Sequence, residues 1–174
     1  MTQMESPIQR IIQLLNLEPL PGEGGLYRQT YRSSEGFPAG ALSERYQGEE
    51  KPICTAIYYM LTDSKDSFSA LHRLPTDEIW HFYLGDPLEM TLLHPDGSSE
   101  QIILGQDIFT GQQLQFTVPR GTWQGTRLVR GGEFGLAGTT MAPGYTLSDN
   151  QIGVRAALLE QYPAERERIL VLTR

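Results

Sequence analysis

The sequence predicts an all-β fold, and three observations lead to this prediction. Short segments rich in apolar and aromatic residues recur along the chain, and turn residues separate them. Glycine and proline occur 18 and 11 times among 174 residues, as a fold with many turns requires. Helical spacing of apolar residues is confined to the two ends of the chain. We therefore expect a β-sandwich or barrel with short helices at the N- and C-terminal ends.

A chain of this length favours a single domain, which we place over residues 1–174. Its expected parts are a helical N-terminal segment at about 6–17, a strand-rich body at about 25–142 and C-terminal helices at about 152–172. Ser6 and Pro7 suit the start of the first helix, because serine caps a helix well and proline needs no backbone donor there. Pro19 is expected to end this helix, and a glycine-rich connector follows it.

Strand-like segments follow one another through the body of the chain. They are 26–32, 52–61, 67–74, 78–84, 88–94, 99–104, 112–118, 122–129 and 134–141. The segment 52–61 is continuously apolar, so we expect it to be buried on both faces. Cys54, the single cysteine, is then a buried strand thiol and no intramolecular disulfide is possible. The polar residues 33–51 are expected to form a long loop.

Charge and hydropathy exclude several classes of partner. The net charge of −7 and the pI of about 4.9 lack the basic footprint of a nucleic-acid binding protein. No apolar run approaches the roughly 18 residues that span a bilayer. The N-terminus has no basic segment followed by an apolar core, so we expect no signal peptide. We predict a cytoplasmic protein that contacts neither nucleic acid nor membrane.

Two adjoining strands carry the strongest candidate site. Side chains alternate between the two faces of a strand, so Glu78, Trp80 and Phe82 share one face of the second strand. His72 lies near the end of the first strand, and a short turn separates it from Glu78. If the two faces coincide, an imidazole and a carboxylate meet above an aromatic floor.

The spacing of these residues resembles the first motif of the cupin superfamily. His72-Arg73-Leu74 fills the His-x-His position, Glu78 is the motif acid, and Gly85 follows six residues after it. Pro119-Arg120-Gly121 resembles the start of the second motif, whose histidine position is occupied by Gln124. The phrases at 24–28, 78–87 and 142–144 are similar to an uncharacterised group of small cupin-like proteins.

This resemblance implies a jelly-roll barrel (a double-stranded β-helix) and commonly a homodimer. Metal-binding cupins hold their metal with the two histidines and the glutamate of the first motif and the histidine of the second. Leu74 and Gln124 replace two of these ligands here, which leaves His72, Glu78 and Gln124 as the reduced set. A divalent transition metal is therefore possible but disfavoured, and we expect that no cofactor is required.

Three functions remain open on these residues. The first is a metal-independent isomerase or epimerase for a small polar metabolite, in which His72 moves a proton and Glu78 orients or shares it. Arg28 and Gln124 would bind polar groups of this ligand, between walls formed by Trp80 and Phe82. The others are a non-catalytic small-ligand binding protein and a metal-dependent cupin enzyme. Each of these residues also has a purely structural interpretation. His72 and Glu78 can hydrogen-bond to each other, Arg28 can lie in solvent, and Trp80 and Phe82 can belong to the core.

Overall fold

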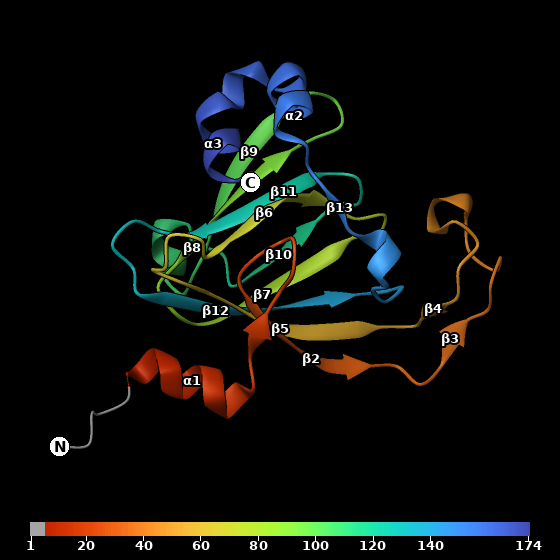
Figure 1. The fold of residues 1–174 in the computed structure, drawn as a ribbon, viewed down its shortest axis with the longest axis horizontal. Helices are drawn as coiled ribbons and strands as arrows, with labels where there is room; N and C mark the ends of the chain where they lie inside the picture. The colour runs from red at the N-terminus through yellow and green to blue at the C-terminus, as the bar shows by residue number, and fades with distance from the viewer. Residues whose placement is uncertain (1–5) are drawn as a thin grey trace.

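Two antiparallel β-sheets face each other across an apolar core, and short helices lie outside them (Figure 1). This computed structural model describes residues 6–174. The prediction of an all-β jelly-roll barrel with helices at both ends is confirmed.

The first sheet has six strands in the order β1-β2-β5-β12-β7-β10. Their bounds are Glu18–Pro19 (β1), Leu26–Arg32 (β2), Thr55–Thr62 (β5), Glu78–Gly85 (β7), Gln115–Val118 (β10) and Phe134–Met141 (β12). Each neighbouring pair is antiparallel. β12 lies between β5 and β7, so a late strand of the chain joins two early ones at the centre of the sheet.

The second sheet has five strands in the order β13-β6-β11-β8-β9. Their bounds are Phe68–Arg73 (β6), Leu88–Leu93 (β8), Ser99–Leu104 (β9), Trp123–Leu128 (β11) and Gln151–Ile152 (β13). β6 passes directly into β7 of the first sheet, so this short connection joins the two layers next to His72 and Glu78.

The expected loop at 33–51 contains a small sheet of its own. β3 (Gly36–Phe37) pairs with β4 (Lys51–Pro52), and the 3-10 turn η1 (Glu44–Tyr46) lies between them. This region extends from one end of the barrel (Figure 1). Further 3-10 turns are η2 (Ile108–Thr110), η3 (Leu147–Asp149) and η4 (Pro163–Glu165).

The predicted strand at 52–61 is divided in the structure. Pro52 belongs to β4, and β5 begins only at Thr55. Proline has no N–H to donate to a strand ladder, which favours a break at this point. Cys54 therefore lies in the connection and is half-buried, and the expectation of a buried strand thiol was wrong.

The core fills the space between the inner faces of the two sheets. Its largest members come from β5, β7 and β8: Tyr59, Leu61, Trp80, Phe82, Leu88, Met90 and Leu92. Tyr59 and Trp80 pack edge to face, with ring centroids 5.5 Å apart. Burial of each such side chain contributes about 1.5–3 kcal/mol to folding, so the barrel wall is a rigid support for polar groups placed on it.

Helices cover the outer faces of both sheets. Helix α1 (Pro7–Leu15) starts at Ser6, whose side chain accepts a hydrogen bond from the Gln9 backbone, and packs on Met60 and Leu136 of the first sheet. Helices α2 (Arg155–Gln161) and α3 (Arg166–Val171) pack on the second sheet. No helix within residues 6–174 is long and apolar enough to cross a membrane.

Candidate functional site

A cavity of about 480 Å³ opens at one end of the barrel. Its walls come from β1, β2, β5, β6, β7 and β12, from the connector between β1 and β2, and from residues after β12. The buried titratable residues that line it include Tyr59 and three side chains that we name the acid–base cluster: Glu23, His72 and Glu78. The cavity thus combines enclosure with groups that can exchange protons.

His72 is the imidazole of this cluster and is held by its own strand. The Nδ1 atom lies 2.8 Å from the carbonyl oxygen of Ala70, which can only accept a hydrogen bond. Nδ1 therefore carries a hydrogen, and in the neutral ring Nε2 keeps its lone pair. Nε2 lies 3.8 Å from a carboxylate oxygen of Glu23. This tautomer makes Nε2 the atom of His72 that can take a proton.

Glu78 is the buried carboxyl group at the start of β7. Gln124 donates a hydrogen bond from Nε2 to Glu78 at 2.6 Å and accepts one from Trp80 Nε1 at 2.9 Å. Burial raises the pKa of Glu78, the charge of Glu23 adds to this, and the charge of His72 together with hydrogen bonds opposes it. Glu78 can therefore keep its proton to a higher pH than an exposed glutamate.

Glu23 is the member of the cluster that sequence reasoning missed. It lies in the glycine-rich connector before β2 and accepts hydrogen bonds from Ser69 Oγ at 2.9 Å and Asn150 Nδ2 at 3.3 Å. Gly24, the next residue, has a φ of +102°, and a Cβ there would collide with the carbonyl oxygen of Phe68. The sequence did contain one signal for Glu23, an acidic residue within the glycine-rich connector at 21–25. Glycines allow such a connector to turn tightly, and a tight turn restricts the direction of the side chain that it carries.

A β-bulge in β2 decides which face of the sheet Arg28 and Arg32 each start from. Arg28 pairs with Tyr58, which packs on the outer face of the sheet, so the side chain of Arg28 starts from that outer face although the residue borders the cavity. The register shifts between Gln29 and Tyr31, and Arg32 then pairs with Thr55 on the inner face. Simple alternation places Arg28 and Arg32 on one face, so the sequence singled out Arg28 and missed Arg32.

A capping loop, defined as residues 142–150, closes one side of the cavity. The Tyr145 backbone N–H donates to Thr55 Oγ1 at 2.9 Å, and Arg32 Nη1 donates to the Tyr145 carbonyl oxygen at 3.2 Å. The side chain of Tyr145 lines the cavity, and burial, helped by the charge of Glu23, raises its pKa to about 12. Tyr145 is therefore a neutral hydroxyl group at ordinary pH.

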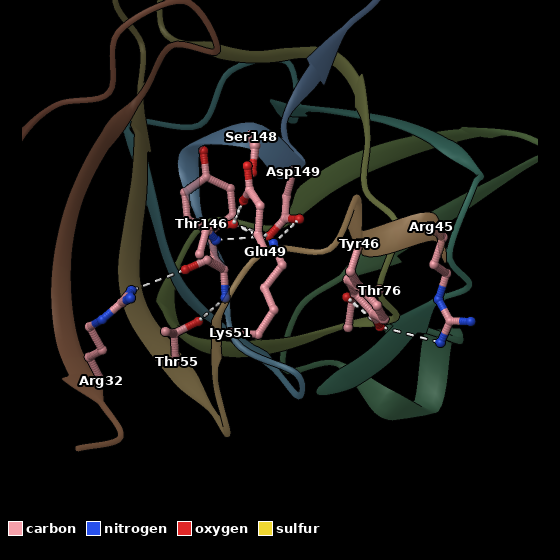
Figure 2. A network of polar contacts seen from close by, with 11 residues as sticks. Arg32, Arg45, Tyr46, Glu49, Lys51, Thr55, Thr76, Thr146, Ser148 and Asp149 are labelled. Carbon is pink, nitrogen blue, oxygen red and sulfur yellow. Dashed lines mark hydrogen bonds and ion pairs between the residues drawn. The ribbon is translucent and has the colours of Figure 1, made fainter. Parts of the chain in front are cut away.

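The capping loop is anchored by a buried ion pair that we name the Lys51 latch (Figure 2). The Lys51 ammonium group, which is 1% exposed, contacts Asp149 and the hydroxyl group of Thr146. Asp149 also accepts a hydrogen bond from the Thr146 backbone at 2.8 Å. Lysine is almost never fully buried unless it is paired, so the latch fixes the loop to β4.

The structure brings some of the predicted site residues together and separates others. His72, Glu78 and Trp80 line the cavity, and Gln124 contacts both Glu78 and Trp80. Phe82 faces the same way as Trp80 but belongs to the packed core between the sheets. The predicted partner of His72 was Glu78, yet its ion-pair partner within residues 6–174 is Glu23.

The residues at the motif positions do not form a usual transition-metal site. Leu74 borders the cavity with an apolar side chain, and Gln124 uses its amide group on Glu78 and Trp80. Within the part of the chain that the structure describes, no group of three or more His, Cys, Asp or Glu residues is arranged to hold a metal ion.

Comparisons with known proteins find relatives over most of the chain. An uncharacterized protein of Saccharomyces cerevisiae is 27% identical over 156 residues, which are 84% of this chain and 77% of that protein. A solved structure from Shewanella oneidensis is 32% identical, with a TM-score of 0.84 over 98% of this chain and 99% of that one.

Two further solved structures are similar to different degrees. A hypothetical protein from Leishmania major is 28% identical, with a TM-score of 0.84 over 97% of this chain and 99% of that one. A cupin 2 domain-containing protein from Halorhodospira halophila shares the fold at 12% identity, with a TM-score of 0.51 over 87% of this chain and 83% of that one. Residues 9–153 match the family described as Cupin superfamily (DUF985), and the chain therefore belongs to the cupin superfamily.

Proposed function

We propose that the cavity binds a small polar metabolite and that the acid–base cluster isomerises or epimerises it without a metal. The observation that carries this proposal is the meeting of Glu23, His72 and Glu78, all buried, on the wall of one enclosed cavity. The volume of about 480 Å³ lies within the range of sites for small ligands. Buried titratable groups in a cleft are typical of catalytic sites.

The cluster supports a proton transfer next to a carbonyl group. His72 Nε2 would take a proton from the carbon beside the carbonyl, and the electron pair of that C–H bond would form a C=C bond. Glu78, whose pKa is raised by burial, would give its proton to the carbonyl oxygen. Glu23, at 3.8 Å, would stabilise the imidazolium ion that forms. Reversal of these transfers at the neighbouring carbon, or on the other face, gives an isomer or epimer.

A second candidate function is ligand binding without catalysis. The observation that favours it is that all three members of the cluster already have partners: Ala70 for His72, Gln124 for Glu78, and Ser69 with Asn150 for Glu23. Such a satisfied cluster could serve as a fixed set of acceptors for the hydroxyl groups of a bound molecule.

A metabolite screen followed by one substitution separates these functions. Ligands are first found by thermal shift, where a ligand at 100 times its Kd raises stability by about 2.7 kcal/mol. His72→Gln is then expected to lower turnover of the ligand by about 100-fold or more while Kd changes little. His94→Gln is the matched control, because His94 lies outside the cavity and pairs with Glu100. Unchanged turnover in His72→Gln would end the catalytic role of this residue.

Metal content provides an independent test of the metal-free mechanism. Protein purified without chelators is analysed for transition metals, and turnover is measured before and after dialysis against a strong chelator. We expect turnover that survives chelation. A stoichiometric metal whose removal abolishes turnover would instead favour a metal-dependent cupin enzyme that uses the reduced ligand set.

A further inference from the structure

The charges along the cavity are arranged unevenly. Glu23 and Glu78 are 8% and 6% exposed, so the carboxyl groups lie deep in the barrel. Arg32 lines the same cavity from the last residue of β2 and is exposed to solvent. The cavity is therefore acidic in its depth and carries a guanidinium group at its rim.

Arg32 is positioned as a binding group. The structure gives its side chain one hydrogen bond within residues 6–174, from Nη1 to the carbonyl oxygen of Tyr145. A guanidinium group has five N–H donors in a planar fork that matches carboxylate and phosphate oxygens. The bond to Tyr145 orients the fork against the capping loop, as Figure 2 shows, and leaves its other donors for a ligand.

Besides Arg28, whose side chain starts from the outer face of the sheet, Glu18 is a further charged residue that borders the cavity, and it favours one orientation for a ligand. Glu18 lines the β1 side, close enough to Tyr27 that its charge, after burial, helps raise the pKa of that tyrosine. A negative group on the ligand is repelled by Glu18 and by the charge of Glu23. It is attracted toward Arg32, while hydroxyl groups of the ligand can donate to Glu23 and Glu78.

The size of the cavity limits the ligand further. A volume of about 480 Å³ corresponds to about sixteen water molecules at roughly 30 Å³ each. We propose that the ligand is a single-ring or short-chain hydroxylated metabolite with one carboxylate or phosphate group, bound with this group at Arg32. This inference rests on the proposed function of the cavity and names its substrate class.

Matched pairs of probes test the inference directly. Glucose phosphate is compared with glucose, ribose phosphate with ribose, and gluconate with sorbitol, by thermal shift and calorimetry, with inorganic phosphate alone as a further probe. We expect at least one anionic member to bind about tenfold or more tightly than its neutral partner. Arg32→Gln should remove this preference, and Arg32→Lys, which keeps the charge but not the fork, should keep part of it.

Two further variants make the result specific to Arg32. Arg10→Gln removes the same charge from the exposed surface of α1 and should keep the preference. Arg28→Gln tests the arginine on the opposite face of β2. A preference lost in Arg28→Gln and kept in Arg32→Gln would overturn the assignment to Arg32.

The outcomes also separate this inference from the function on which it rests. Equal binding of the neutral and anionic members would overturn the proposed substrate class and leave the proposed function standing. Failure of every probe to bind the wild-type protein would count against both. Circular dichroism of each variant verifies that a lost preference does not come from unfolding.

Discussion

Two largely buried pairs of titratable side chains in this molecule differ in how their atoms are bonded. The side chains of Lys51 and Asp149 are 0% and 3% exposed, and those of His72 and Glu23 are 3% and 11% exposed. In the Lys51 latch the two charges are in direct contact, and Thr146 bonds to both. In the acid–base cluster the charged atoms are 3.8 Å apart, beyond hydrogen-bond distance.

The two pairs differ more in how their atoms are bonded than in how deeply they are buried. In the Lys51 latch the ammonium group donates both to the carboxylate of Asp149 and to the hydroxyl group of Thr146, and these bonds hold the capping loop. Among residues 6–174, the structure gives Nε2 of His72 no hydrogen-bond partner, and the residue lines the cavity. Under the proposed function, a bound ligand would supply the hydrogen bond that Nε2 lacks.

Removal of the lysine should have the largest effect on stability. Lys51→Met leaves the carboxylate of Asp149 buried without its charge partner, and we expect a loss of about 3–5 kcal/mol in the free energy of unfolding. The double variant Lys51→Met with Asp149→Leu should recover much of this loss, because no isolated charge remains. Urea unfolding measures both. A loss below about 1 kcal/mol in the single variant would show that the latch is not structural.

A backbone change should displace Glu23 without altering any charge. Gly24→Ala puts a Cβ at a φ of +102° and against the Phe68 carbonyl oxygen, so we expect a loss of about 1–3 kcal/mol and weaker ligand binding. Gly22→Ala is the matched control, since its φ is +79° and a Cβ there meets nothing within 4 Å. If both variants behave alike in unfolding and binding, the collision has no role in holding Glu23.

The matching change in the acid–base cluster should cost little stability. His72→Gln keeps Ser69 and Asn150 as partners of Glu23, so we expect a change below about 1.5 kcal/mol in the free energy of unfolding. If His72 acts in catalysis, His72→Gln should lower turnover strongly while the free energy of unfolding changes little. A loss as large as that in Lys51→Met would make His72 a structural residue.

The pH dependence of stability should show that folding disfavours the charged form of Glu78. Its pKa is raised in the folded state, so the folded protein holds the proton more tightly than the unfolded chain does. This contribution to stability is full below the unfolded value of about 4.3 and is lost as pH rises to the folded value. Glu78→Gln cannot titrate, so its stability relative to wild type should increase across that window in urea unfolding. A relative stability that is flat with pH would contradict the raised pKa.

The fold and half of the candidate site could be predicted from the sequence. Alternation gave the inward side of Glu78 and Trp80 correctly, because β7 is regular through that stretch. The bulge in β2 reversed the side of Arg32, and no local signal marks a bulge that tertiary pairing produces. Glu23 was missed for a different reason, since a connector gives no period from which to infer direction.

The bonding of Glu23 has a consequence for how the site is assembled. Its partners Ser69 and Asn150 come from the middle and the late part of the chain. During synthesis, Asn150 is added to the chain 127 residues after Glu23, so this hydrogen bond forms late. Such non-local contacts slow folding, and the hydrogen bond to Asn150 can form only after the late part of the chain has been synthesised. Ligand capture would then report that the whole barrel, from connector to capping loop, has closed.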